Sequence, residues 1–399
     1  MSRAVVVIGA GASGTAAAYA ARRAGARVTV VSERPGATAL ASGALDGADR
    51  ATRSLGDARV EVRSFLGELG IWELVDEGCW VATSSGVLRS SRGRDRAVLD
   101  LSHVARGTIA VLGVARRGWD AAALAKAWMS DPWAFARGLR FEPIESDVLR
   151  RASEALLPDV DFAKCHDEAE RKGWLVDRLR SSVALRDKSA IVMGPWLGLE
   201  SDVAGGLSAA LEKPVGEPLS PPGGIAGARF ELARDKLLAK IGAERVSGSV
   251  RLVGADGLRG RPRVELDTEL IVEGDAVVLA VGGLVGGGIA WEPEFGGAGF
   301  ALSFAAPAVL AIGGERLSPS GSPHGALFER FAWSGERGRA GIERVGIWTD
   351  DKGQVRDAQG DAIAWLYAAG DAVADAPRTL LDAVRAGLAA GGAAALERG

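Results

Sequence analysis

The stretch that most restricts the fold is AVVVIGAGASGTAAAYAARRAGARVTVV, which spans residues 4–31. Its first residues, 4–8, are small and β-branched, which is typical of a strand buried on both faces. A glycine-rich turn follows, then a helical stretch at 13–23 and a second strand at 28–31. The order of strand, glycine turn, helix and strand predicts a Rossmann-like βαβ unit.

The glycine turn indicates a dinucleotide site. Gly9, Gly11 and Gly14 stand at G-x-G-x-x-G spacing. In this motif the first glycine permits a tight turn, the second lets a pyrophosphate approach the backbone, and the third lets the helix pack close to the strand. The helix that begins at Ser13 would hold the phosphate at its N-terminus through free amide groups and the helix dipole.

The end of the second strand departs from the usual pattern. An acidic residue normally stands there and bonds the ribose of the adenosine half, but this chain has Ser32. A serine hydroxyl can make one hydrogen bond, but not the bidentate, charge-assisted one of a carboxylate. The neighbouring Glu33 and Arg34 are the other candidates for binding the adenosine end, and the sequence leaves the choice open.

A second signature lies near the C-terminus. A short apolar strand at 365–369 turns at Gly370 and Asp371, and a helix of small residues follows at about 380–396. In flavoproteins with this kind of N-terminus, the aspartate bonds a ribityl hydroxyl and the helix points its positive end at the flavin. The two signatures together predict FAD, with FMN as the alternative because Ser32 weakens the adenosine half.

The predicted fold is α/β, a Rossmann-like FAD-binding domain with three ββα layers and an inserted α+β cap domain. A strand at 276–281 runs into Gly282 and Gly283, where the chain would pass the cofactor on its return from the cap. The predicted boundaries are 1–60, 216–290 and 346–399 for the FAD-binding domain, 61–215 for the cap, and 291–345 for a return through the cap and a loop.

Composition excludes several classes of protein. The net charge of -3 does not favour nucleic acid as a partner. Two cysteines and three histidines cannot build an iron–sulfur cluster, and they leave little for a metal site. The sequence begins directly with a strand and holds no apolar run long enough for a membrane span. We therefore expect a cytoplasmic protein without a transmembrane segment. Any association with the inner face of the membrane would be through its partners.

Five passages together resemble the glycerol-3-phosphate dehydrogenase B family, whose members belong to the anaerobic glycerol-3-phosphate dehydrogenase complex. They are SGALDG (42–47), GPWLGLES (194–201), PLSPPGGIAGARFELARDKL (218–237), AVVLAVGGLVGGGI (276–289) and VGIWTDDKGQVRDAQGDAIAWLYAAGD (345–371). That family also carries a small hydroxyl residue where the ribose-binding acid usually stands. The resemblance implies Ser42 and Gly43 as further cofactor-binding residues. It also implies a second flavoprotein and an iron–sulfur protein as partners.

Oxidation of an alcohol requires a base for its proton and cations for an anionic group of the substrate. His324, in a loop of glycine and serine, is the candidate base, and Arg229 and Arg378 are the candidate cations. One hypothesis is an FAD-dependent dehydrogenase acting on glycerol 3-phosphate or another small hydroxy compound. The other is a flavin-bearing component that transfers electrons without substrate chemistry. An NAD(P)H-dependent flavin reductase is a weaker third, because it needs a second dinucleotide fingerprint.

Overall fold

The computed structural model describes residues 2–46, 55–255, 260–294, 297–317 and 344–396. The chain forms two compact units. Unit 1 comprises Met1–Thr38, Ala51–Phe65 and Arg234–Gly399. Unit 2 comprises Ala39–Arg50 and Leu66–Ala233.

These units differ from the predicted boundaries at four places. The described residues 39–46, predicted in the FAD-binding domain, belong to unit 2, and residues 61–65, predicted in the cap, belong to unit 1. Residues 216–233 belong to unit 2, because helix α8 (Ile225–Lys240) begins in unit 2 and ends in unit 1. The described residues of the segment 291–345 belong to unit 1 and not to a cap. The proline- and glycine-rich stretch before α8 therefore precedes a helix of unit 2, and the change of unit occurs inside the helix itself.

Unit 1 is built on a six-stranded sheet with the order β19-β20-β13-β1-β2-β9. Its strands are β1 (Ala4–Ile8), β2 (Arg27–Val31), β9 (Glu244–Val246), β13 (Ala276–Leu279), β19 (Gln354–Arg356) and β20 (Ala362–Ala368). All neighbours are parallel except β19, which is antiparallel to β20. The carboxyl ends of the five parallel strands therefore share one edge of the sheet.

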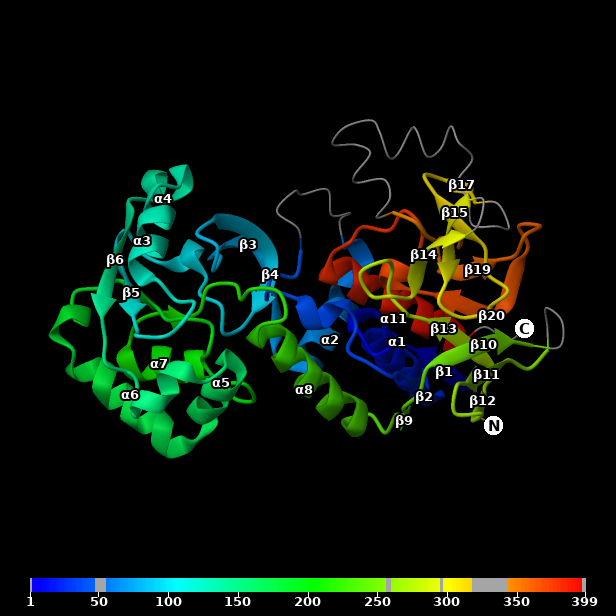
Figure 1. Ribbon diagram of the computed structural model, residues 1–399, viewed down its shortest axis with the longest axis horizontal. Coiled ribbons are helices and arrows are strands. Elements are labelled where there is room, and N and C mark those ends of the chain that lie inside the picture. Colours follow the sequence, from blue (N-terminus) through cyan, green and yellow to red (C-terminus); the bar gives the residue numbers. More distant parts are fainter. Residues whose placement is uncertain (1, 47–54, 256–259, 295–296, 318–343, 397–399) are drawn as a thin grey trace. The chain divides into compact units, whose positions relative to one another are not determined.

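The remaining elements of unit 1 cover the two faces of this sheet (Figure 1). The helices are α1 (Ala12–Arg23) and α11 (Leu380–Leu396), with α2 (Arg59–Leu69) and α8 shared between the units. The smaller sheets are formed by β10 (Val250–Gly254), β11 (Arg263–Leu266), β12 (Ile271–Glu273), β14 (Ile289–Glu294), β15 (Gly297–Leu302), β16 (Leu310–Ile312), β17 (Glu315–Arg316) and β18 (Gly346–Ile347).

The alternation of side chains along β1 explains the three layers. Val5 and Val7 pack with the alanines of α1 and α11. Val6 and Ile8 point to the opposite face and pack with apolar residues of the antiparallel sheet β10-β11-β12. A strand that is apolar at every position can bury both faces in this way. The predicted Rossmann-like fold with ββα layers is confirmed, and the second β layer is the antiparallel sheet β10-β11-β12.

Helices α1 and α11 pack side by side (Figure 1), and glycines make this contact close. A Cβ on Gly387 would lie 2.1 Å from the carbonyl oxygen of Ser13, and one on Gly391 would lie 2.2 Å from that of Ala17. Residues four apart on each helix therefore meet backbone against backbone. The predicted helix at 380–396 has these bounds in the structure, but its closeness to α1 was not expected.

We expect Gly391→Ala to lower the free energy of unfolding by about 3 kcal/mol, because the new methyl would overlap the backbone of α1. The adjacent Gly392 is the matched control, since a Cβ there meets nothing within 4 Å. Gly392→Ala should raise the free energy of unfolding by about 0.5–1 kcal/mol through helix propensity. Urea denaturation followed by circular dichroism measures both variants, and equal unfolding midpoints would contradict the close packing.

Unit 2 contains a four-stranded parallel sheet with the order β6-β5-β7-β8 and a separate hairpin β3-β4. Its strands are β3 (Trp72–Ala82), β4 (Leu88–Asp95), β5 (Gly107–Gly113), β6 (Leu139–Glu145), β7 (Ala190–Val192) and β8 (Val215–Gly216). Its helices are α3 (Ala121–Met129), α4 (Pro132–Arg137), α5 (Asp159–Asp167), α6 (Ala169–Ser181) and α7 (Val203–Leu211). Unit 2 is thus a mixed α and β domain with a core of its own.

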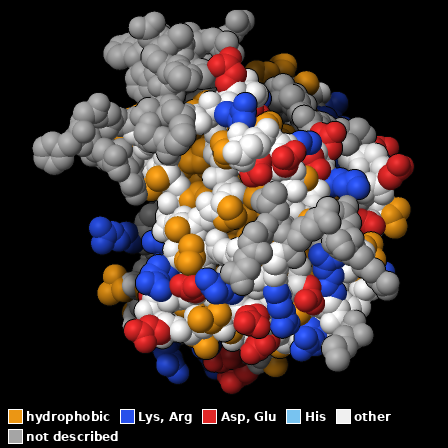
Figure 2. Space-filling model, turned by 90° about the vertical axis from the view of Figure 1, so that its right-hand side faces the viewer, with side chains coloured by type: hydrophobic (Ala, Val, Ile, Leu, Met, Phe, Trp, Pro, Cys, Tyr) orange, Lys and Arg blue, Asp and Glu red, His pale blue; other side chains and the backbone are white. Residues whose placement is uncertain are grey.

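The surface and the helices add two findings. The face of the molecule in Figure 2 carries Lys and Arg side chains interspersed with Asp and Glu, without a large area of one sign. Among the residues that the structure describes, no helix is long and apolar enough to cross a membrane.

Candidate cofactor site

Two glycines of the N-terminal turn are required by packing within unit 1. Gly9 has φ +101°, and a Cβ there would lie 2.3 Å from the carbonyl oxygen of Ala280. A Cβ on Gly14 would lie 1.9 Å from the carbonyl oxygen of Gly9. These contacts bring the end of β1 against the end of β13 and seat α1 on the turn, so no larger residue fits at either position.

Gly11 differs because the space beside it is open. A Cβ there would meet only the hydroxyl oxygen of Thr38, at 3.2 Å. That hydroxyl accepts the amide hydrogen of Ala12 at 3.0 Å. The next two amides, those of Ser13 and Gly14, have no acceptor in the described part of the chain. Free donors beside an open glycine make this helix N-terminus suited to an anionic group.

The other predicted segments of unit 1 meet at the same edge of the sheet. Gly370 has φ +69°, and a Cβ there would lie 2.6 Å from the hydroxyl oxygen of Ser13. A Cβ on Gly283 would lie 2.6 Å from the carbonyl oxygen of Asp371. The preceding Gly282 has φ +78°, which favours glycine. Three turns that are far apart in sequence are therefore in contact.

Asp371 is the acidic group of this cluster. It follows β20 in a short 3-10 helix, Gly370–Ala372, and its side chain is 30% exposed. Burial raises the pKa of its carboxyl group, and the guanidinium of Arg378, 3.9 Å away, opposes this shift. No donor among the described residues hydrogen-bonds to the carboxylate. Asp371 can therefore accept a hydrogen bond from a ligand hydroxyl.

Arg378 supports the turn that carries Asp371. Its guanidinium donates to the carbonyl oxygens of Asp371 (2.7 Å), Val373 (3.3 Å) and Val345 (3.0 Å). The predicted role of Arg378 was to bind a substrate anion. In the structure its donors hold backbone carbonyls within unit 1, so the geometry favours a positioning role.

The end of β2 contributes the three candidates for the adenosine end. Ser32 is half-buried, and its amide donates to the carbonyl oxygen of Val246 at 3.0 Å. Glu33 is exposed, and its carboxylate accepts the hydroxyl of Ser249. Arg34 is also exposed and lies close to the loop that follows β13. These residues therefore differ in how far they are already engaged within the protein.

Ser42 and Gly43 belong to unit 2, whereas the cluster just described belongs to unit 1. The carbonyl oxygen of Ser42 accepts the amide of Ser220 at 2.9 Å, and that of Gly43 accepts the amide of Asp95 at 2.7 Å. Gly43 has φ +104° and packs against Asp95. Within unit 2 these two residues act as backbone partners of neighbouring segments.

Arg229 lies at the centre of a buried ion-pair network in unit 2. It is 4% exposed, and its guanidinium forms a bidentate pair with Glu217, with both N–O distances 2.8 Å. Its other donors reach the carbonyl oxygens of Gly198 and Leu197, at 2.8 and 3.2 Å, and the carboxylate of Asp95 at 3.5 Å. All five N–H groups are thus used inside the protein. Arg229 therefore has no donor left for a substrate anion, contrary to the prediction from sequence.

His324, the candidate base, lies outside the described residues. Three residues with clear roles were not predicted from sequence. Thr38 occupies the first amide of α1 with its hydroxyl, and Glu217 and Asp95 are the partners of Arg229. No local motif marks these three residues, because each acquires its role from a segment distant in sequence.

Unit 2 has a switch point of its own, between β5 and β7, where ligands of parallel sheets commonly bind. Aromatic side chains fill it. Trp119 follows β5 and Trp196 follows β7, and their ring centroids are 5.4 Å apart. Both are buried, together with Phe162 and the guanidinium of Arg116, which lies 4.2 Å from the Phe162 ring. This edge of the sheet is therefore closed by packing.

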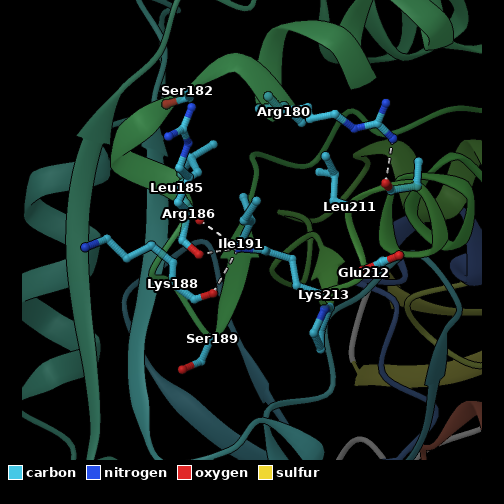
Figure 3. A pocket seen from close by; sticks show the side chains of 13 residues that line it. Arg180, Ser182, Leu185, Arg186, Lys188, Ser189, Ile191, Leu211, Glu212 and Lys213 are labelled. Carbon is cyan, nitrogen blue, oxygen red and sulfur yellow. Dashed lines mark hydrogen bonds between the residues drawn. The ribbon is translucent and has the colours of Figure 1, made fainter.

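A pocket of about 800 Å³ lies at the opposite edge, beside the amino ends of β7 and β8 (Figure 3). Its cations are largely engaged. Lys213 donates to the carbonyl oxygens of Leu185 (2.7 Å), Arg186 (3.2 Å) and Lys188 (3.2 Å). Arg180 donates to that of Ala210 at 2.8 Å. These contacts stabilise the ends of helices, and we assign no ligand to the pocket.

The buried imidazole of His166, in unit 2, should make the stability of the protein depend on pH. It is fully buried, its Nδ1 lies 3.0 Å from the carbonyl oxygen of Trp196, and its Nε2 has no partner among the described residues. Burial lowers the pKa of this imidazole to about 4, against an ordinary value of 6.5. The folded state therefore keeps His166 neutral over a range in which the unfolded chain binds a proton.

We expect the stability that depends on His166 to be complete above pH 6.5 and to be lost as the pH falls toward 4. The loss should amount to about 3 kcal/mol. His166→Asn keeps a donor for Trp196 and removes the titration, so its unfolding free energy should change less over this range. Urea denaturation at several pH values measures both proteins. Parallel curves for the two would contradict the prediction.

The comparison of families decides the cofactor. Residues 4–72 match the family described as FAD binding domain. The cofactor is FAD. The prediction from sequence is thereby confirmed, and the coarser functional prediction, a flavin-dependent oxidoreductase, agrees with this family. The narrower resemblance to the glycerol-3-phosphate dehydrogenase B family stays a prediction.

The solved structures to which this chain is similar share little sequence identity with it. The 3-ketosteroid-delta4-(5alpha)-dehydrogenase of Rhodococcus jostii RHA1 is 14% identical, with 98% of this chain and 96% of that one covered and a TM-score of 0.38. The open conformation of a flavocytochrome c3 fumarate reductase is 12% identical, with 98% and 78% covered and a TM-score of 0.38. None of the curated protein sequences compared with the chain matches it. These similarities carry no argument about substrate.

The residues of unit 1 fit FAD. The free amides of Ser13 and Gly14 suit the pyrophosphate, and the open side of Gly11 leaves room for it. Asp371 offers a ribityl hydroxyl a carboxylate that accepts no hydrogen bond from the described residues, at the same edge of the sheet. Anion-binding donors and a hydroxyl acceptor thus stand within one unit, as a flavin dinucleotide requires.

Proposed function

We propose that this chain is an FAD-dependent oxidoreductase that oxidises a small hydroxy compound such as glycerol 3-phosphate, or relays the electrons of that oxidation to an iron–sulfur partner. The observation that carries the proposal is the contact between the turns at 9–14, 282–283 and 370–371 at one sheet edge of unit 1. The resemblance of five passages to the glycerol-3-phosphate dehydrogenase B family supports the substrate class.

When bound, FAD supplies an acceptor for the two electrons of the oxidation. The residues of unit 1 bind and orient it. Ser13 and Gly14 donate amide hydrogens to its anionic part, and Asp371 accepts a hydroxyl hydrogen. Arg378 holds the backbone on which Asp371 stands. A loss of Arg378 would therefore act through the position of Asp371.

A second candidate, a flavin-bearing component without substrate chemistry, has support from the two predicted cations. Arg229 is fully paired inside unit 2, and Arg378 donates to backbone carbonyls. Arg229 has no donor left for a substrate phosphate, and the donors of Arg378 hold the turn that carries Asp371. In that case a partner protein would bind the substrate, and this chain would hold an intermediate flavin of the electron path.

Anaerobic reduction of the purified chain distinguishes the two candidates. Glycerol 3-phosphate should bleach the flavin absorbance of an enzyme without any partner, and glycerol serves as the control without the phosphate. If the flavin bleaches only after the partner proteins are added, the electron-transfer role is correct. A flavin that dithionite reduces, but that glycerol 3-phosphate reduces in neither preparation, would overturn this substrate class.

The partners follow from the same proposal. The two cysteines of the chain cannot hold an iron–sulfur cluster, so an iron–sulfur centre that receives the electrons would belong to another protein. We expect a complex with a second flavoprotein and an iron–sulfur protein. Co-purification from the native cell, followed by analysis of iron and flavin content, tests this expectation. A monomer that reduces a dye with glycerol 3-phosphate would overturn it.

A further inference from the structure

The adenosine end of the FAD site lacks its usual carboxylate. Ser32 stands at the end of β2, where an acidic residue normally accepts hydrogen bonds from the ribose. The carboxylate of the neighbouring Glu33 already accepts the hydroxyl of Ser249, from the segment between β9 and β10. Recognition of the ribose through a free carboxylate at this strand end is therefore weakened at both positions.

Arg34 lies in a different place from Glu33. A Cβ on Gly287 would lie 2.6 Å from Nη2 of Arg34 and 3.5 Å from its Cζ, so the guanidinium rests over this glycine. Gly287 has φ +75° and belongs to the turn after β13, where its amide donates to the carbonyl oxygen of Leu284. Glycine both adopts this conformation and leaves room for the guanidinium.

The order of strands shows where the contact between Arg34 and Gly287 lies relative to the glycine turn at 9–14. In the sheet, β1 lies between β2 and β13. A side chain that starts after β2 and ends over the turn after β13 therefore spans the carboxyl end of β1, where the turn at 9–14 begins. All of these segments belong to unit 1. Arg34 thus brings a positive charge to the edge that carries the free amides of Ser13 and Gly14.

The chemistry of the guanidinium selects its ligand. It presents five N–H donors and no acceptor, in a planar array that matches the oxygens of a phosphate. Among the described residues, Arg34 has no hydrogen-bond acceptor and no ion-pair partner. The pyrophosphate of FAD is an acceptor with negative charge, whereas the ribose hydroxyls bind most strongly to a carboxylate, which this position lacks.

We propose that Arg34 binds the pyrophosphate of FAD, so that the adenosine half is recognised through its phosphates and not through its ribose hydroxyls. The inference rests on the assignment of FAD to unit 1. It decides between the candidates that the sequence left open, in favour of Arg34 over Glu33. The proposal has two measurable consequences. The affinity for FAD should depend on the charge of residue 34, and the affinity for ADP should not depend on the ribose 2′-hydroxyl.

The experiment measures dissociation constants of the full chain, freed of flavin, for FAD, FMN, ADP and 2′-deoxy-ADP. Arg34→Ala should lower the affinity for FAD and for ADP by about 10- to 100-fold, which is the effect of losing one or two charge-assisted hydrogen bonds. The affinity for FMN, which lacks the pyrophosphate, should change much less. Arg34→Lys should be intermediate, because it keeps the charge and loses the planar array. Arg27→Ala, at an exposed position of β2, is the control and should bind all four as the natural chain does.

The natural chain should bind ADP and 2′-deoxy-ADP within about threefold, because less than 1 kcal/mol then depends on the 2′-hydroxyl. Either of two results would overturn the proposal: an Arg34→Ala protein that binds FAD as tightly as the natural chain, or a natural chain that prefers ADP over 2′-deoxy-ADP by more than about tenfold. A natural chain that binds no FAD at all would instead refute the cofactor assignment.

Discussion

Gly11→Ala is expected to give a folded protein that no longer retains FAD. A methyl group at this position meets only the hydroxyl of Thr38, at 3.2 Å, so the chain can accommodate it. The same methyl would occupy the space through which a pyrophosphate approaches the amides of Ser13 and Gly14. The loss of these charge-assisted hydrogen bonds should lower the affinity for FAD at least about 100-fold.

Flavin content after purification and the dissociation constant of added FAD measure this effect, and circular dichroism reports the fold. Gly67→Ala is the control, because a Cβ there meets nothing within 4 Å. Gly14→Ala should behave differently from Gly11→Ala and unfold unit 1, since its methyl would lie 1.9 Å from the carbonyl oxygen of Gly9. A Gly11→Ala protein with a full complement of FAD would show that this turn does not face the phosphates.

Arg229→Met should lower the free energy of unfolding of unit 2 by about 3–5 kcal/mol, because it leaves Glu217 and Asp95 buried without their cation. Burial raises the pKa of the Glu217 carboxyl group even with Arg229 present. Urea denaturation followed by tryptophan fluorescence reports on unit 2, where buried Trp128 and Trp196 lie.

Arg178→Met is the matched control in the same unit. Its ion pair with Asp147, at 2.6 Å, is exposed, with side-chain exposures of 47% and 71%. An exposed pair of this kind contributes about 0–1 kcal/mol. The double variant Arg229→Met, Glu217→Met should recover part of the lost free energy of unfolding. It buries one unpaired carboxylate fewer than Arg229→Met alone. An Arg229→Met protein as stable as the Arg178→Met protein would contradict the role assigned to the network.

The site could be predicted where spacing in sequence fixes local geometry. The turn at 9–14 needs glycines at its first and third marked positions because of contacts with the adjoining strand and helix, and the sequence pattern encodes this directly. The turn at 370–371 follows its strand in the same local manner. Their contact through Gly370 and Ser13 agrees with the prediction that the two ends of the chain serve one cofactor.

The roles of individual charged residues could not be predicted in the same way. Arg229 resembled a substrate-binding cation because it stands beside a proline- and glycine-rich boundary. Its partners Glu217 and Asp95 are 12 and 134 residues away. Whether an arginine is free or paired depends on which carboxylates the fold brings within hydrogen-bonding distance, and no local pattern records that.

The sequence by itself determined the βαβ unit and the glycine turns, because each depends on residues within one or two turns of the chain, and it predicted FAD, with FMN as the alternative, from two such local signatures. The tertiary structure alone decided where the units divide, how closely Gly387 and Gly391 bring α11 to α1, and that Arg34 lies over Gly287 while Glu33 bonds Ser249. These contacts join segments hundreds of residues apart. Their distances are fixed by the packing of the whole sheet and its layers, and not by the spacing of residues along the chain.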